Sequence, residues 1–165
     1  MSVVWLLRFL GFDRDELLKD ENLHMRLKVQ KAAYLLKYLN VSPFNKYDFN
    51  LYIHGPYSPE LAREYYNLEI SNEIRAEDKM PEISNEHLEL LRWFIDHDDR
   101  WLEIATSILI VREQYPELKY NDVYNILRSS KPWLTKEEYK KVYDELKSKT
   151  QLRIEGTQLL RLSRH

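Results

Sequence analysis

Apolar side chains recur at intervals of three and four residues through much of this chain. The clearest run consists of Met25, Val29, Ala32, Leu36 and Leu39. This spacing places side chains on one face of an α-helix. Glycine, which weakens helices, occurs only three times in 165 residues. The chain is therefore expected to be mainly α-helical.

Residues that start and stop helices divide the chain into segments. Ser58 and Pro59 mark a helix start, because a serine side chain can accept a hydrogen bond from a free main-chain amide and proline suits the first helical position. Thr135 and Glu138 have the spacing of a capping box. The helices expected on this basis span residues 3–9, 25–39, 59–68, 84–112 with a break at 97–99, 122–129 and 135–147.

Two regions favour extended structure. Residues 47–53 alternate large apolar with smaller polar side chains, and Gly55-Pro56 is expected to end this strand. Residues 152–162 are expected to fold as a β-hairpin around Gly156. The segment 69–83 leaves two alternatives open, a pair of short strands or an irregular loop. The predicted fold is mainly α with short β-hairpins.

Length and composition narrow the class of protein. A chain of this length forms one compact domain or two very small units that share a core. The absence of cysteine excludes thiol catalysis, disulfides and thiolate metal sites. No apolar run approaches the roughly 20 residues of a membrane-spanning helix. We therefore expect a cytoplasmic protein without membrane contact.

The net charge of −2 conceals an uneven distribution. Residues 1–117 carry 14 basic and 21 acidic side chains, whereas residues 118–165 carry 11 basic and 6 acidic ones. The segment 22–47 contains five basic residues and no acid. Such segregation is typical of a nucleic-acid-binding face or a self-association face, and it also arises by chance.

Side chains that are capable of catalysis occur without the spacing that catalysis needs. His54 and Ser58 resemble a base and a nucleophile, but a serine before proline at a helix start is more typical of a cap, and His54 is expected to bond the backbone of its turn. His97 lies among three aspartates, but neighbouring helix positions point in different directions, so at most two of these side chains can share a metal ion. We expect no catalytic residue, no metal site and no cofactor.

The basic residues favour DNA contacts instead. The C-terminal order of helix, helix and hairpin is that of a helix-turn-helix with a wing, although acids are interleaved along the second helix. Tyrosines such as Tyr65, Tyr139 and Tyr143 share helix faces with Leu or Val, so we expect them in the core and not stacked on bases. The predicted phosphate contacts are Lys28, Lys31, Lys37, Lys136, Lys140, Lys147, Arg153 and Arg161.

Three motifs between residues 26 and 68 carry a resemblance to a known family. They are Lys28-Val29-Gln30-Lys31-Ala32-Ala33-Tyr34-Leu35, Tyr47-Asp48-Phe49 and Gly55-Pro56-Tyr57-Ser58-Pro59-Glu60-Leu61. Their order and spacing resemble those of the YwgA-like family and, more distantly, the Panacea (SocA-like) antitoxin domain. The resemblance implies a winged-helix-like arrangement and a regulatory or interaction role without known catalysis.

Together these observations predict two winged-helix-like units packed together, residues 1–83 and 84–165. The first functional hypothesis is a non-enzymatic, transcription-regulator-like protein that binds double-stranded DNA. The alternative is a protein interaction module of antitoxin or adaptor type without DNA binding. In that alternative the acidic surface around residues 60–86 meets a basic protein partner or a second copy of the chain.

Overall fold

The computed structural model describes residues 2–68 and 81–155. The described residues are mainly helical, as the sequence predicts, and include a small two-stranded antiparallel sheet. The α-helices are α1 (Ser2–Leu10), α2 (Arg14–Leu17), α3 (Leu23–Tyr38), α4 (Pro59–Tyr66), α5 (Asn85–Ile95), α6 (Asp99–Gln114), α7 (Tyr120–Ser130) and α8 (Lys136–Lys147). The strands are β1 (Asn50–Tyr52) and β2 (Gly55–Tyr57), and the 3-10 helices are η1 (Asp20–Asn22), η2 (Phe44–Lys46) and η3 (Thr150–Leu152).

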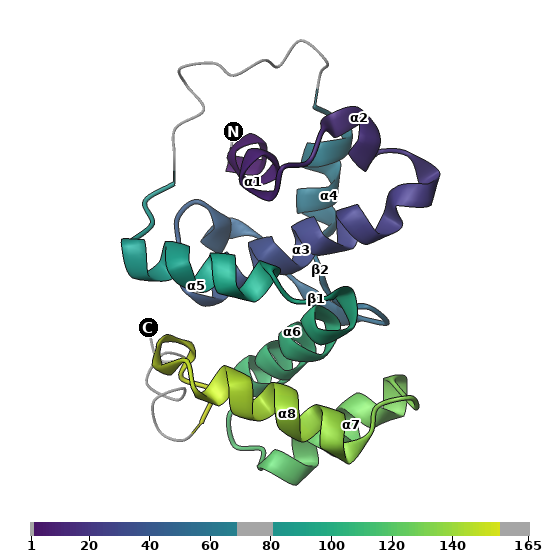
Figure 1. Cartoon of the computed structure of the whole chain (residues 1–165), viewed down its shortest axis with the longest axis vertical. Coiled ribbons are helices and arrows are strands. Elements are labelled where there is room, and N and C mark those ends of the chain that lie inside the picture. The colour runs from purple at the N-terminus through teal and green to yellow at the C-terminus, as the bar shows by residue number, and fades with distance from the viewer. Residues whose placement is uncertain (1, 69–80, 156–165) are drawn as a thin grey trace.

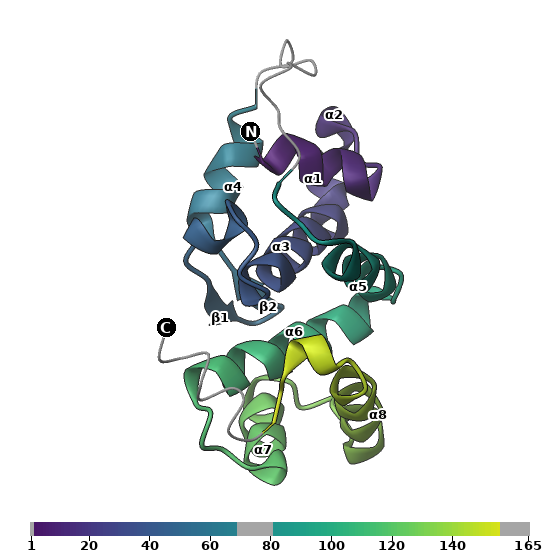
Figure 2. The same ribbon diagram turned by 90° about the vertical axis from the view of Figure 1, so that its left-hand side faces the viewer.

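Helix α6 crosses the middle of the molecule (Figures 1 and 2). Helices α3, α4 and α5 and the sheet lie on one side of α6, and α7 and α8 lie on the other. One continuous cluster of buried apolar side chains runs through both predicted units. Helix α5, which belongs to the predicted second unit, packs against α3 of the first. The two units therefore share a single core, with α6 at its centre.

Helix α3 is buried more completely than its apolar stripe predicts. All residues from 29 to 36 are buried, among them the polar Gln30 and Lys31. Helices α1, α5 and α6 and strand β2 pack around α3, so that little of its surface remains for water. An amphipathic surface helix was expected, and a central helix is found.

The strand predicted over residues 47–53 is shorter in the structure and is followed by a second strand that was not predicted. Strand β1 pairs with β2 in antiparallel register, with Leu51 opposite Pro56 and a two-residue loop between the strands. Gly55 begins the second strand, so the prediction that Gly55-Pro56 ends the extended segment is wrong. Its φ of +108° suits glycine, and an added Cβ would lie 3.1 Å from Thr106 Oγ1 on α6. The backbone at the start of β2 therefore packs closely against α6.

Several predicted helix boundaries are confirmed. Ser58 Oγ accepts from the Leu61 N–H at 3.2 Å, and Thr135 Oγ1 accepts from the Glu138 N–H at 3.1 Å. The predicted break at 97–99 separates α5 from α6, and Asp98 caps α6. The segment 69–80 lies outside the described residues, so its two alternatives stay open. Among the described helices, none is long and apolar enough to span a bilayer.

Candidate functional site

Helices α7 and α8 and the turn between them carry the exposed basic residues of the C-terminal part. Between Asp122 and Glu137 the sequence contains no acid. Arg128 near the end of α7 and Lys136 at the start of α8 are both exposed. Lys136 is the first residue of α8, the second helix of this pair.

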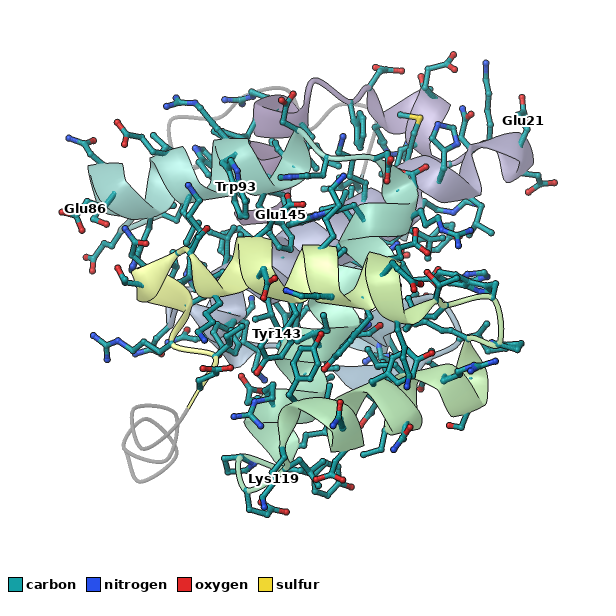
Figure 3. All side chains as sticks on the ribbon, turned by 60° about the horizontal axis from the view of Figure 1, so that its bottom comes forward. Glu21, Glu86, Trp93, Lys119, Tyr143 and Glu145 are labelled. Atoms are coloured by element: carbon teal, nitrogen blue, oxygen red, sulfur yellow. The ribbon has the colours of Figure 1, made fainter. Side chains whose placement is uncertain are left out.

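A cluster of tyrosine rings joins α7 to α8. The rings of Tyr120 and Tyr143 meet edge to face at 4.7 Å, and Tyr139 OH donates to the Tyr120 carbonyl at 2.7 Å. Burial raises the pKa of Tyr139 and Tyr143 well above the usual range, so both hydroxyls stay neutral. Figure 3 shows Tyr143 on the side of α8 that faces α7. The prediction that Tyr65, Tyr139 and Tyr143 belong to the core is confirmed by their burial.

Two of the predicted cations on this face already hold acidic partners. Lys140 Nζ lies 2.6 Å from Asp144 Oδ2, and this hydrogen bond raises the pKa of Lys140. Lys147 Nζ lies 3.2 Å from Glu155 Oε2. Exposed ion pairs of this kind contribute little to stability, so these acids hold the two lysines only weakly.

The predicted C-terminal hairpin is wrong in its first half. Leu152 ends the 3-10 helix η3, and Arg153 has a left-handed φ of +50°. The cause is the core: Leu152 and Ile154 are both buried, and Arg112 Nε donates to the Ile154 carbonyl at 2.8 Å, which satisfies an atom that a strand ladder would use. The second half, 156–165, which includes Arg161, lies outside the described residues.

The predicted cations of α3 are engaged in the fold. Lys37 Nζ donates to the Tyr47 carbonyl and lies 3.9 Å from Asp48 Oδ1. Lys28 is half-buried. Lys31 is only 3% exposed and cannot meet the backbone of a duplex in this arrangement. The three lysines predicted to contact phosphate from segment 22–47 therefore do not form an exposed basic surface, and that prediction is wrong.

Lys31 instead lines a cavity of about 360 Å³ between the hairpin loop, α6 and the α7–α8 turn. Other lining residues include Ile53, His54, Glu103 and Trp133. Burial lowers the pKa of Lys31, and the nearby Glu103 carboxylate opposes this effect. The resemblance motifs meet here, since the missing Cβ of Gly55 would lie 3.7 Å from Lys31 Cε.

A second lysine that the sequence did not single out completes this region. Lys131 is fully buried, and its Nζ lies 2.8 Å from the Ile53 carbonyl oxygen and 2.9 Å from Glu103 Oε2. His54 Nδ1 lies 3.2 Å from Glu103 Oε1, so His54 contacts a carboxylate and not the backbone of its turn as expected. No local pattern marks Lys131 as buried, because its partners are 28 and 78 residues away.

The remaining candidates have structural partners. Ser58 caps α4, as predicted from its place before proline at a helix start. The ring of His97 stacks on Trp101 at 3.6 Å, and His97 Nε2 lies 3.5 Å from Glu145 Oε2. Within the described parts of the chain, no three His, Asp or Glu side chains gather as metal ligands would. His97 thus contributes to an aromatic cluster between α5, α6 and α8.

No protein-family model matches this chain, and comparisons with curated proteins and with solved structures give no significant match.

Proposed function

We propose that this protein is a non-enzymatic regulator that binds double-stranded DNA through α7, α8 and the turn between them. The observation that supports this proposal is that the segment 123–136 contains no acid. Within it, Arg128 near the end of α7 and Lys136 at the start of α8 are both exposed. The resemblance to the YwgA-like family and the Panacea domain points to the same regulatory class.

The contacts in this proposal are mainly to phosphates. Lys136 and Arg128 approach the backbone at the start of α8, and Lys140, Lys147 and Arg153 extend the contact along and beyond that helix. Helix α8 carries four lysines and four acids, so its own field is close to neutral. Two of these five cations, Lys140 and Lys147, are already paired with acids, so about three phosphates are neutralised in net terms. The logarithm of the binding constant is then expected to fall with the logarithm of the salt concentration with a slope of about −3, which is a weak dependence for a DNA-binding protein.

Fluorescence anisotropy with a labelled random-sequence duplex tests this proposal. Binding is expected to weaken as salt increases, and the double variant Arg128→Ala/Lys136→Ala is expected to flatten the salt slope by one to two units. Lys19→Ala is the matched control, because Lys19 is an exposed, ion-paired lysine in the opposite half of the chain. An absence of binding at about 50 mM salt, or an equal effect of the control, contradicts the proposal.

A second candidate is a protein interaction module without DNA binding, and the exposed hairpin tip favours it. Ile53 is 72% exposed and Tyr52 is 51% exposed, which is unusual for two adjacent large apolar residues. The partner in this case is a basic protein or a second copy of the chain. Sedimentation velocity of the full chain and of Ile53→Asp tests self-association: a dimer that the substitution dissociates supports this candidate, and a monomer that binds the duplex supports the first.

A further inference from the structure

The cavity that Lys31 lines has the chemistry of a small-molecule site. It lies where four separate parts of the chain meet: α3, the loop between β1 and β2, the start of α6, and the α7–α8 turn. Its volume of about 360 Å³ lies within the range of ordinary ligand pockets. The cavity shares the α7–α8 turn with the proposed DNA-binding surface, but none of the side chains proposed to contact phosphate lines it.

Lys31 contributes a positive charge to this cavity, near the carboxylates of Glu103 and Asp99 but in direct contact with neither. Its side chain is 3% exposed, and among the described residues its Nζ has no hydrogen-bond or ion-pair partner. Both oxygens of the Glu103 carboxylate, which lines the same cavity, have other partners, Oε2 in Lys131 and Oε1 in His54. Lys31 Nζ is not one of the fully enclosed unpaired polar atoms among the described residues, so it reaches the cavity, where its N–H groups can donate to an anion.

The rest of the lining selects the body of that anion. Leu27, Ile53 and Trp133 offer apolar surface. The guanidinium of Arg100 lies 4.2 Å over the Trp133 ring and holds two hydrogen bonds to Glu138, so it fixes the ring at the rim. Asp99, the second carboxylate of the lining, is exposed at the start of α6. Apolar surface combined with a few polar groups, here Lys31 among them, is typical of small-molecule pockets.

We propose that this cavity binds a small organic carboxylate with an apolar body. The carboxylate accepts hydrogen bonds from Lys31 Nζ, and the body packs against Ile53 and Trp133. The same loop and turn are joined by Lys131, whose Nζ bonds the Ile53 carbonyl. A ligand in the cavity therefore contacts both segments that Lys131 connects.

Titration of the full chain with sodium benzoate, followed by proton–nitrogen NMR, tests this proposal. Saturable shifts are expected at Ile53, at the Trp133 indole and at the Lys31 ammonium. The neutral isostere benzamide is expected to bind about tenfold more weakly, because it carries no negative charge to pair with Lys31. Lys31→Met is expected to remove benzoate binding, whereas Lys28→Met, on the same helix but outside the cavity lining, is expected to retain it.

The comparison of benzoate with benzamide uses the wild-type chain, so the test holds even if Lys31→Met fails to fold. Three results would overturn the proposal: no saturable shift at about 10 mM benzoate, equal binding of benzamide, or undiminished binding by Lys31→Met. Inorganic phosphate that binds more tightly than benzoate would also overturn it, because the apolar wall would then contribute nothing.

Discussion

Lys131 and Glu103 form an ion pair between the α7–α8 turn and α6, with Nζ 2.9 Å from Oε2. The lysine is fully buried, and the glutamate side chain is 14% exposed. The same Nζ donates to the Ile53 carbonyl at 2.8 Å and so connects the hairpin loop to α6 and to the α7–α8 turn. One ammonium group thereby connects three segments that lie far apart in the sequence.

Removing this ammonium group should destabilise the protein. Lys131→Met leaves the Glu103 carboxylate and the Ile53 carbonyl oxygen without their shared donor, and we expect a loss of about 2 to 3 kcal/mol in the free energy of unfolding. Lys136→Met, which removes an exposed lysine five residues away, should change it by less than about 0.5 kcal/mol. Urea unfolding measures both; equal values would contradict the role assigned to Lys131.

Lys31 should behave in the opposite way, because its charge is buried without a partner. At pH 7 we expect Lys31→Met to stabilise the protein by about 1 kcal/mol. Since burial lowers the pKa of Lys31 in the folded state, that state releases the proton at lower pH than the unfolded chain does. Wild-type stability should therefore rise relative to Lys31→Met as the pH increases from the lowered pKa to the ordinary value of 10.5.

Urea unfolding of wild type and Lys31→Met at several pH values measures this difference. Subtracting the two curves cancels the contributions of the tyrosines whose pKa is raised. A difference that stays constant up to pH 10.5 would show that Lys31 is not desolvated in the folded state. A residue whose removal stabilises the chain but abolishes benzoate binding would be one retained for function and not for folding.

Gly55 should be far less tolerant of substitution than Gly11. Both have positive φ, +108° and +72°, so alanine is strained at either position. At Gly55 the added Cβ also lies 3.1 Å from Thr106 Oγ1, whereas at Gly11 nothing lies within 4 Å. We expect losses of about 3 kcal/mol for Gly55→Ala and about 1 kcal/mol for Gly11→Ala. Thermal unfolding checks the order, and a larger effect at Gly11 would contradict the packing of the turn on α6.

Gln30 should be important for placing α4. Its Oε1 accepts from the Ser58 N–H at 2.8 Å, and its Nε2 donates to the Ser58 carbonyl at 3.0 Å. In Gln30→Leu the Ser58 N–H is buried without an acceptor, so we expect a loss of about 2 kcal/mol. Gln114→Leu, at the exposed end of α6, is the control. Hydrogen exchange should show faster exchange at the start of α4 in Gln30→Leu alone.

Local patterns were sufficient for the helices that have clear ends. The caps at Ser58 and Thr135 and the break at 97–99 depend on a few adjacent residues, so sequence alone predicts them. The C-terminal hairpin failed for the converse reason. Its alternating pattern is compatible with a strand. In the structure, however, the distant Arg112 donates a hydrogen bond to the Ile154 carbonyl, and the side chains of Leu152 and Ile154 are buried in the core.

The candidate cavity could not be predicted, because its polar groups come from separate segments. The sequence predicted Lys31 to be a phosphate contact and therefore exposed, and no sequence pattern singled out Lys131. The burial of both follows from the packing of α3, α6 and the α7–α8 turn, which no local window contains.

The sequence by itself determined that this chain is mainly helical and where most helices begin and end, because these properties follow from residue spacing and capping within a single turn. It also determined that basic residues predominate at the C-terminal end. Only the tertiary structure decided which cations face solvent and which are buried. That outcome depends on how elements distant in sequence cover one another, and it separates Lys136, which is exposed, from Lys31, which is enclosed beside a cavity.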